Sequence, residues 1–584
     1  MLIVGFNAWH GDVAAAVVKD GRLVAALEEE RFARVKHVAG FPTQAILAGL
    51  REAGATPRDV DVWAVARGRR VHLLRKAWFA LTHRPAGALA TQYRRRAAQW
   101  AGITDTLCGE LGLDRDEAAV RLRFVEHHPA HLASAYYASG MDEAACCAID
   151  GFGDFVSASV GHGRGHRLDV LSRTWFPHSL GLFYLALTQY LGFKHYGDEF
   201  KVMGLAPYGR PVHADRVARL VRLTANGGFE LDLSYFRHWT GEVTMQWESG
   251  APEVPDVYSP RLEELLGPAR QPGEPVTAEH EHLAASLQHV FEQAAWHVLR
   301  GAHARVPLPN LCLAGGCAMN SVMNGKIRAN TAFSRVFIQP AAGDNGTALG
   351  AALHVWFNEG AGVSPVRMRH AAWGTSWPDE AVAGIIRDSG IGDDGRCRWT
   401  VAPDEGALCD TVADALAGGA IVGWFQGRME WGARALGHRS ILADPRRADM
   451  REVINRKIKF RERFRPFAPA VLAEAVDDYF VGAVEDPFML QVYPVRPDKR
   501  DVIPAVTHVD GSGRLMTVNA TDHPRFHRLI SAFAGRTGVP VLLNTSFNEN
   551  EPIVEHPAQA IDCFLRTDMD MLAIGRHVLV KVGR

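Results

Sequence analysis

Hydrophobic runs separated by short polar loops follow the same plan twice in the first third of the chain. An apolar run over residues 2–6 is followed by a polar loop over 7–12 and by two further apolar runs that flank Asp20-Gly21. An Asp-Gly pair between such runs is typical of a tight β-hairpin. The plan returns over 144–171, again with a buried run, a polar loop and a hairpin. The pattern therefore predicts two related strand–loop–hairpin units.

These two units predict a duplicated α/β domain in which each half is a sheet flanked by helices. The polar loops of both halves are expected to face one cleft. The arrangement resembles the actin, sugar-kinase and Hsp70 group with its ribonuclease H-like halves. This is a similarity of architecture, which by itself says little about function.

Two glycine-rich stretches are expected to complete the cleft. Over 311–320 the pattern predicts a buried strand, a tight turn and a helix start, and over 339–352 it predicts a loop followed by a helix of small residues. Glycine lets backbone amides approach a phosphate or an adenosine closely. Ordinary strand-to-helix packing explains the same glycines and remains the alternative. The candidate contacts are Gly315, Gly316, Asn320 and Gly343, with Asp344 as a candidate metal ligand.

Two histidines four residues apart are the strongest indication of a chemical site. His127 and His131 share one face of a predicted helix, because a helix repeats every 3.6 residues, and Pro129 is tolerated in the first turn. Asp150 ends a buried apolar run and offers a carboxylate from a strand end. Two imidazoles and a carboxylate in this arrangement are typical of an open metal site. Coincidence remains an alternative, because the chain contains 26 histidines.

A second chemistry is indicated beyond a turn-rich linker over 361–378. A predicted helix over 407–417 and a strand over 421–425 precede two segments, 427–440 and 457–469, in which arginines stand among glycines and aromatic residues. Guanidinium groups bind phosphate oxygens in pairs and remain charged, so these segments predict a polyphosphate site. Neither of the two common glycine-rich phosphate motifs is present, which argues against an ordinary P-loop NTPase or dehydrogenase.

Composition narrows the class of protein. The chain has 584 residues, of which 47% are hydrophobic and 22% charged, and a net charge of −1. These values predict two or three soluble domains and argue against a general nucleic-acid binder. No apolar run reaches the roughly eighteen residues of a membrane span, and no secretory signal is recognisable. The eight cysteines form no Cys-x-x-Cys pair and are expected to be reduced, so we expect a cytoplasmic protein.

A basic segment over 67–104 does not fit either predicted site. It holds nine Lys or Arg residues and no Asp or Glu, with Trp78, Phe79, Tyr93 and Trp100 among them. Basic amphipathic helices of this kind lie on membranes or bind acidic partners. A domain cap or a solvated face is the alternative that we favour.

In this order along the chain, the motifs resemble those of the O-carbamoyltransferase family, which includes nodulation-factor and antibiotic carbamoyltransferases. The matching segments run from 28–37 to 544–548, the latter expected in a loop after a strand over 539–543. The resemblance implies a domain over 1–365 that is similar to the universal tRNA threonylcarbamoyl transferase. It also implies a YrdC-like α/β domain over 376–584.

The resemblance implies an activity as well. The YrdC-like domain would use carbamoyl phosphate and ATP, with Mg²⁺, to make carbamoyl-adenylate. A hydroxyl of a small natural product or glycan would then take the carbamoyl group beside a metal ion, Fe(II) or another divalent ion, as AMP departs. The family's Lys-x-Arg and Ser-x-Asn pairs fall on Lys459, Arg461, Ser546 and Asn548, and its metal ligands on His127, His131, Asp150 and Asp344.

The predicted cleft and the family resemblance together indicate the remaining site residues. His10 or Asp12 is the candidate general base, because either side chain can accept a proton near neutral pH. A loop-stabilising role for Asp12 is the alternative. The nucleotide and carbamoyl phosphate are expected to contact Arg434, Arg439, Arg465, Arg514, Gly315, Gly316, Asn320, Gly343 and Lys36.

Two departures from the family pattern and several open questions accompany this hypothesis. Met516 stands where a glutamine is usual, and a glycine is missing before Glu551, which leaves fine contacts near the adenylation pocket open. A sugar kinase that produces ADP is one competing hypothesis. A metal- and nucleotide-binding regulatory protein, or a tRNA-modifying factor, is another. The identity of the acceptor and the oligomeric state, including a homodimer, cannot be read from the sequence.

Overall fold

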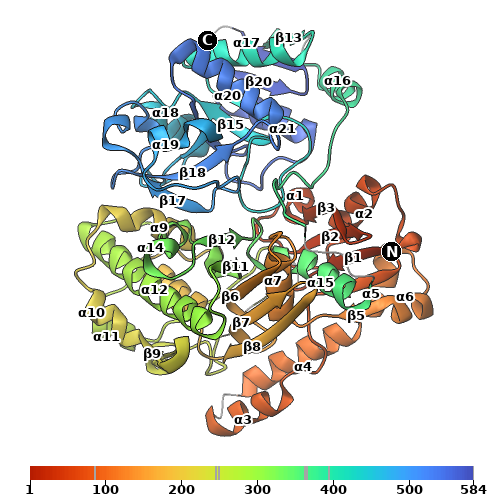
Figure 1. Ribbon diagram of the computed structural model, residues 1–584, viewed down its shortest axis with the longest axis vertical. Helices are drawn as coiled ribbons and strands as arrows, with labels where there is room; N and C mark the ends of the chain where they lie inside the picture. The colour runs from red at the N-terminus through yellow and green to blue at the C-terminus, as the bar shows by residue number, and fades with distance from the viewer. Residues whose placement is uncertain (84–86, 244–245, 247–249, 361–365, 392–394, 583–584) are drawn as a thin grey trace. The chain divides into compact units, whose positions relative to one another are not determined.

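The computed structural model describes residues 1–584 except 84–86, 244–245, 247–249, 361–365, 392–394 and 583–584. The chain forms two compact units, Met1–Met368 and Arg369–Arg584, and each is described by itself (Figure 1). Part of the predicted linker, 361–365, lies outside the described residues.

The first unit contains two five-stranded sheets with the same strand order. The first sheet runs β3-β2-β1-β4-β5 and the second β8-β7-β6-β11-β12. In both, the first three strands along the chain are antiparallel neighbours and the last two are parallel to the first. The predicted duplication is therefore confirmed. The strands are β1 (Leu2–Phe6), β2 (Ala14–Lys19), β3 (Arg22–Glu28), β4 (Val62–Val65), β5 (Leu122–Phe124), β6 (Glu143–Gly153), β7 (Val156–Arg164), β8 (Arg167–Trp175), β11 (Asn310–Ala314) and β12 (Arg335–Ile338).

The predicted hairpin of the first half is present as β2 and β3. Asp20 and Gly21 form its turn with φ of 50° and 76°. Positive φ at both central positions matches the twist of the flanking strands, and this is why Asp-Gly favours the turn.

Each half ends in a helix that packs on the sheet of the other half. Helix α7 (His127–Tyr136) follows β5 but packs on β6 and β11, and α15 (Asp344–Glu359) follows β12 but packs on β1 and β2. The two helices also pack on each other at Gly350, where a Cβ atom would lie 1.7 Å from the Ala130 carbonyl oxygen. The exchange brings together the N-terminal ends of both helices, which carry His127, His131 and Asp344 of the predicted metal ligands.

Further helices lie between the strands of each half. The insertion between β4 and β5 contains α3 (Leu73–His83), α4 (Gly87–Ala101), α5 (Ile103–Leu111) and α6 (Arg115–Arg121). The insertion between β8 and β11 contains α8 (Leu180–Tyr190), α9 (Glu199–Leu205), α10 (Ala214–Val217), α11 (Arg261–Leu266), α12 (Ala278–Arg305) and the hairpin β9 (Val221–Thr224) and β10 (Gly228–Leu231). The remaining helices are α1 (Glu30–Ala33), α2 (Thr43–Glu52), α13 (Ser321–Gly325) and α14 (Ile327–Asn330).

The second unit is a mixed sheet in the order β13-β21-β20-β14-β15-β19-β16-β18-β17 with helices packed against it. The fold class predicted from the sequence, a duplicated kinase-like domain followed by a second α/β domain, is confirmed. The strands are β13 (Cys397–Val401), β14 (Val422–Phe425), β15 (Arg439–Ala443), β16 (Ala468–Leu472), β17 (Gln491–Pro494), β18 (Ser512–Val518), β19 (Val541–Ser546), β20 (Met571–Ile574) and β21 (His577–Lys581). The helices are α16 (Asp379–Asp388), α17 (Glu405–Ala417), α18 (Met450–Ile454), α19 (Val476–Tyr479), α20 (Pro524–Thr537) and α21 (Pro557–Arg566).

One local prediction in this unit was wrong. Residues 544–546 are not in a loop, because they pair with residues 440–442 of β15 and extend β19 to Ser546. Cross-strand pairing at this position outweighs the low strand propensity of Asn and Ser.

Among the described residues, none of the helices combines the length and the apolar character that crossing a bilayer requires.

Candidate functional site

Four side chains converge at the N-terminal ends of α7 and α15. His127 Nε2 and His131 Nε2 lie 3.1 Å apart, and Asp344 Oδ1 lies 3.4 Å from each of them. Asp150 Oδ2 lies 3.4 Å from His127 Nε2 and 3.8 Å from His131 Nε2. The structure thus brings together all four predicted metal ligands, which come from two helices and the bulged end of β6.

These separations fit a shared cation. Nitrogen and oxygen ligands lie about 2.0–2.2 Å from a metal such as zinc, so neighbouring ligand atoms at angles of about 90–110° are separated by about 3.0–3.5 Å. Most of the observed separations fall in this range. Imidazole and carboxylate together suit a first-row divalent ion. The donor set therefore fits the metal that the family resemblance implies.

The charges of the cluster also favour a cation. Burial disfavours the charged imidazolium, yet the carboxylates of Asp344 and Asp150 outweigh it and raise the pKa of His127 to about 10. Burial likewise opposes ionisation of Asp344, but His10 and His127 hold its pKa well below the usual range. The two carboxylates thus remain negative in a buried place. Such a pair needs a positive partner, which protons or a metal ion can provide.

The Gly315-Gly316 turn positions Asp150. The amide of Gly316 donates to Asp150 Oδ1 at 2.8 Å, which leaves Oδ2 directed at the two histidines. Gly315 has φ of 89°, and a Cβ atom there would lie 2.3 Å from the Ile149 carbonyl oxygen. Only glycine meets both conditions without strain. The turn was predicted to contact a nucleotide, and its observed contact is with a candidate metal ligand.

A carboxylate outside the cluster holds the start of α7. Asp154 Oδ2 accepts hydrogen bonds from the amides of His127 at 3.0 Å and Gly68 at 2.5 Å. A carboxylate at a helix N-terminus stabilises the helix through the helix dipole. The neighbouring His128 bonds through Nε2 to the Val156 carbonyl oxygen at 2.9 Å and so faces away from the cluster.

The two candidate bases occupy different places. His10 Nδ1 lies 3.0 Å from Asp344 Oδ2, so the imidazole borders the cluster. Asp12 instead pairs with His37, and their Oδ1 and Nδ1 atoms lie 2.7 Å apart. Of the two, His10 has the direct contact with a candidate metal ligand.

The Asp12–His37 pair is held in an unusual backbone conformation. Both residues are left-handed, with φ of 60° and 55°, and such values are uncommon outside glycine. Burial opposes the charged form of His37, but Asp12 and Glu30 outweigh it and raise its pKa to about 9. The His37 amide also donates to Glu30 Oε2 at 2.8 Å. Backbone strain of this kind is frequent at functional sites.

The other residues of the first unit that were predicted to bind nucleotide are Asn320, Gly343 and Lys36, and they differ in their contacts. Asn320 caps α13 by accepting from the Met323 amide, and its amide group exchanges two hydrogen bonds with Gln288. Gly343 precedes α15 as its N-cap, and Lys36 is exposed. The polar atoms of Asn320 are thus engaged within the protein.

The second unit gathers half-buried arginines. Burial and the charges of neighbouring arginines lower the pKa of Arg514 well below its usual range, and the same causes lower the pKa of Arg434 to about 10 and of Arg461 to about 9. Arg465 contributes to all three shifts. Within the described parts of the chain, no group accepts from Arg434 Nε, Arg461 Nη2 or Arg514 Nε. Guanidinium groups that repel one another and keep buried donors unused favour an anionic ligand.

Arg439 differs from these four arginines. It is fully buried, its Nη1 donates to the carbonyl oxygens of Gln426, Gly427 and His438, and its guanidinium lies 3.6 Å from the centre of the Phe425 ring. These contacts support the turn between β14 and β15. The position indicates a structural contribution beside the predicted contact with a nucleotide.

The Lys-x-Arg and Ser-x-Asn pairs meet in space. Lys459 Nζ donates to the carbonyl oxygens of Ser546 and Asn548, both at 2.6 Å, and to Asn548 Oδ1 at 2.7 Å. The Ser546 hydroxyl donates to the same Asn548 oxygen at 2.8 Å. Arg461 is held by Asn455 Oδ1 at 3.0 Å. The lysine therefore anchors the segment that carries Arg461 to the end of β19.

The two departures from the family pattern have different consequences. Met516 is fully buried in β18, and its sulfur lies 3.6 Å from the Asn544 side-chain amide, so it packs in the core. Glu551 accepts from the amides of Glu549 and Asn550, which closes the turn without the missing glycine.

Three residues that support the candidate site residues were not identified from the sequence. Glu430 Oε1 accepts from the amides of Leu436, His438 and Arg439 and so shapes the loop that carries Arg434. Asp154 supports the candidate metal ligand His127, and His37 pairs with Asp12. For Glu430 the available signal was its isolation, since it is the one acidic residue in the segment 427–440.

Comparison with known proteins identifies similar sequences along nearly the whole chain. The model of the carbamoyltransferase N-terminus matches residues 2–353, and the model of the carbamoyltransferase C-terminus matches residues 413–581. The nodulation protein NolNO of Sinorhizobium fredii is 38% identical over 98% of this chain and 80% of its own length. The nodulation protein NolO of Bradyrhizobium diazoefficiens is 39% identical over 78% of this chain and 79% of its own.

Two solved structures are similar to part of the chain. The activator of 2-hydroxyisocaproyl-CoA dehydratase from Clostridium difficile is 11% identical, with a TM-score of 0.32 over 62% of this chain and 95% of that protein. HypF from T. kodakarensis has a TM-score of 0.29 over 61% of this chain and 47% of that protein.

Proposed function

Because the chain belongs to the carbamoyltransferase family and is therefore a carbamoyltransferase enzyme, we propose that it transfers the carbamoyl group of carbamoyl phosphate to a hydroxyl group in an ATP-dependent reaction. The acceptor is a small natural product or a glycan. ATP is converted to AMP and pyrophosphate through carbamoyl-adenylate.

The arginine cluster of the second unit is the observation that carries this proposal. Arg434, Arg461, Arg465 and Arg514 repel one another, and three of them keep buried donors unused among the described residues. Carbamoyl phosphate and the triphosphate of ATP supply the dispersed negative charge that such a cluster favours. Guanidinium groups pair with phosphate oxygens in a planar, bidentate way, and this also orients the phosphates for reaction.

The proposed activation uses two bond exchanges. Water releases phosphate from carbamoyl phosphate and leaves carbamate. A carbamate oxygen then attacks the α-phosphorus of ATP and pyrophosphate leaves, so that carbamoyl-adenylate forms. Carbamate is a poor electrophile because its nitrogen donates into the carbonyl, and the AMP anhydride provides a good leaving group. The arginines offset the charge that develops on the phosphates.

The proposed transfer takes place at the cluster in the first unit. His127, His131, Asp150 and Asp344 would hold a divalent ion such as Fe(II), which when bound supplies Lewis-acid polarisation. His10 borders Asp344 and accepts the proton of the acceptor hydroxyl. The hydroxyl oxygen bonds to the carbamoyl carbon, and AMP departs with the electron pair of the broken bond.

The decisive experiment follows the products of ATP. The full chain is incubated with carbamoyl phosphate, ATP, Mg²⁺, Fe(II) and a panel of hydroxylated acceptors. We expect AMP, pyrophosphate and a product that is heavier than its acceptor by one HNCO unit in mass spectrometry. ADP as the only nucleotide product would contradict the proposal and favour a kinase. Failure to form AMP with any acceptor in the panel would contradict it too.

A further inference from the structure

Helix α3 presents an apolar stripe to solvent on the outside of the first unit. Leu74, Trp78 and Leu81 are 87%, 63% and 73% exposed. Their spacing of i, i+4 and i+7 places them on one face of the helix. Scattered apolar residues on a surface are ordinary, but a continuous stripe with a tryptophan marks an interaction site.

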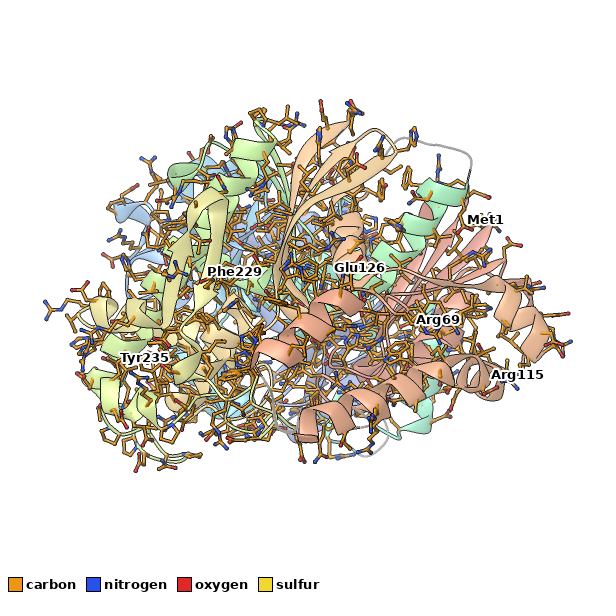
Figure 2. The ribbon with its side chains drawn as sticks, turned by 90° about the horizontal axis from the view of Figure 1, so that it is seen from below. Met1, Arg69, Arg115, Glu126, Phe229 and Tyr235 are labelled. Carbon is orange, nitrogen blue, oxygen red and sulfur yellow. The ribbon has the colours of Figure 1, made fainter. Side chains whose placement is uncertain are left out.

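The stripe belongs to a helix that is firmly attached to the domain. On its opposite side Phe79 is buried, and its ring centre lies 5.3 Å from that of Phe176 and 5.6 Å from that of Phe155. His72 Nε2 lies 2.7 Å from Glu126 Oε1. The exposed stripe is therefore the outer face of a docked helix. Helices α3 and α4 project at the lower side of the first unit in Figure 1 and face the viewer in Figure 2.

The segment that carries the stripe holds charges of one sign. The segment 67–104 contains nine Lys or Arg residues and no Asp or Glu, although the whole chain is close to neutral. Arg69, Arg70 and Arg75 are exposed beside the stripe, and Arg94 and Arg95 are exposed on α4. A groove of about 600 Å³ is lined by Arg70, His72, Leu73, Leu74, Arg75 and Trp78. Its lining is both cationic and apolar.

We propose that this α3–α4 face docks on an anionic phospholipid bilayer. A helix with leucine and tryptophan on one face and arginines around it lies in the interface between water and lipid, where the apolar side chains enter the acyl region and the arginines bind headgroup phosphates. The charge complementarity selects an anionic surface. The docking does not depend on the proposed carbamoylation chemistry.

The face is connected to the metal cluster by hydrogen bonds. Asp154 accepts from Gly68, shortly before α3, and from His127, the first residue of α7. Glu126, which precedes His127, contacts His72. These hydrogen bonds link the segment before α3 to the start of α7, the helix that carries two of the candidate ligands.

Vesicle sedimentation with the full chain tests the inference. We expect the protein to sediment with vesicles of equal parts phosphatidylglycerol and phosphatidylcholine, to remain soluble with phosphatidylcholine alone, and to be released as salt screens the charges. A variant with Leu74→Ser, Trp78→Ser and Leu81→Ser should bind at least about tenfold more weakly, because burial of these side chains is lost. The control variant carries Val120→Ser, Val212→Ser and Leu223→Ser, at residues that are exposed elsewhere in the first unit.

The measurements distinguish bilayer docking from self-association and from loss of folding. Equal binding by both variants, or no sedimentation with anionic vesicles, would overturn the proposal. If light scattering shows a dimer for the natural sequence and a monomer for the α3 variant, the face is an interface between two copies of the chain and the proposal is wrong. Circular dichroism and AMP formation with a soluble acceptor show whether each variant is folded and active. Loss of vesicle binding with retained AMP formation would therefore leave the proposed function untouched.

Discussion

The ammonium group of Lys459 lies 2.7 Å from Oδ1 of Asn548, although 89 residues separate the two in the chain. The same group donates to two carbonyl oxygens, of Ser546 and Asn548. The lysine is buried, so its charge is stabilised by these oxygens and not by water. This contact joins the end of β19 to the segment that carries Arg461.

Replacement of this lysine should separate the two segments. We expect Lys459→Met to abolish AMP formation and to lower the stability of the second unit, since each buried acceptor left without a donor costs about 1–3 kcal/mol. Product chromatography and thermal melting measure the two effects. Arg456→Met, at an exposed position nearby, is the matched control and should leave both unchanged. A fully active Lys459→Met enzyme would remove Lys459 from the proposed mechanism.

Two arginines of the second unit should respond in opposite ways to the same substitution. Arg514→Met removes a charge that neighbouring arginines repel, so the melting temperature in the absence of ligand should stay level or rise. Arg439→Met removes the hydrogen bonds that join the guanidinium to the Gln426 and Gly427 carbonyl oxygens of the turn, so the melting temperature should fall. Pyrophosphate should stabilise the natural protein and the Arg439→Met variant, but not Arg514→Met. Stabilisation of Arg514→Met by pyrophosphate would refute the anion site.

Substitution of a candidate metal ligand should lower the affinity of the protein for a metal ion. His131→Gln removes one of the four converging ligand atoms. Mutation of residues that only hydrogen-bond to a metal ligand typically lowers metal affinity by ~10–100-fold. We expect the loss of a ligand itself to lower the affinity for Fe(II) or Zn²⁺ by more than this. Metal analysis after dialysis and a metal-dependent shift in melting temperature measure it. His162→Gln, at a partly exposed histidine outside the cluster, should bind metal normally. Equal metal content in both variants would mean that the metal is bound elsewhere.

The glycine turn should be essential for the position of Asp150. In Gly315→Ala the new methyl group would meet the Ile149 carbonyl oxygen at a left-handed position, which displaces the adjacent ligand. We expect weaker metal binding and a lower melting temperature. Gly109→Ala places a methyl group in open space on α5, where alanine favours the helix, and should leave the melting temperature level or slightly raised. Normal metal binding by Gly315→Ala would show that the turn tolerates displacement.

The Asp12–His37 pair should make stability depend on pH. The pKa of His37 is raised from 6.5 to about 9 in the folded protein, where burial opposes the charge and Asp12 and Glu30 outweigh it. The folded state therefore holds this proton more tightly than the unfolded state, so the stabilisation is fully present below pH 6.5 and is lost as the pH rises through about 9. We expect melting temperatures of the natural protein to fall more over this range than those of His37→Gln. Parallel curves would show that the pair does not couple protonation to folding.

Local features of both units could be predicted from the sequence. The shared face of His127 and His131 follows from the helical repeat, and Asp150 follows from its place at the end of an apolar run. The Asp20-Gly21 hairpin follows from the φ angles that this pair adopts readily. Each of these depends on a few neighbouring residues, and periodicity and turn chemistry describe such short-range properties well.

Only the tertiary structure decided which distant groups meet and which contacts they make. Asp344 joins the histidines because α7 and α15 each pack on the sheet of the other half. Arg439 supports a turn whereas Arg514 faces other arginines, although the sequence predicted a nucleotide contact for both. Ser546 belongs to a strand because β15 offers it a partner. Burial and pairing are set by the packing of segments far apart in the chain, and no local pattern carries that information.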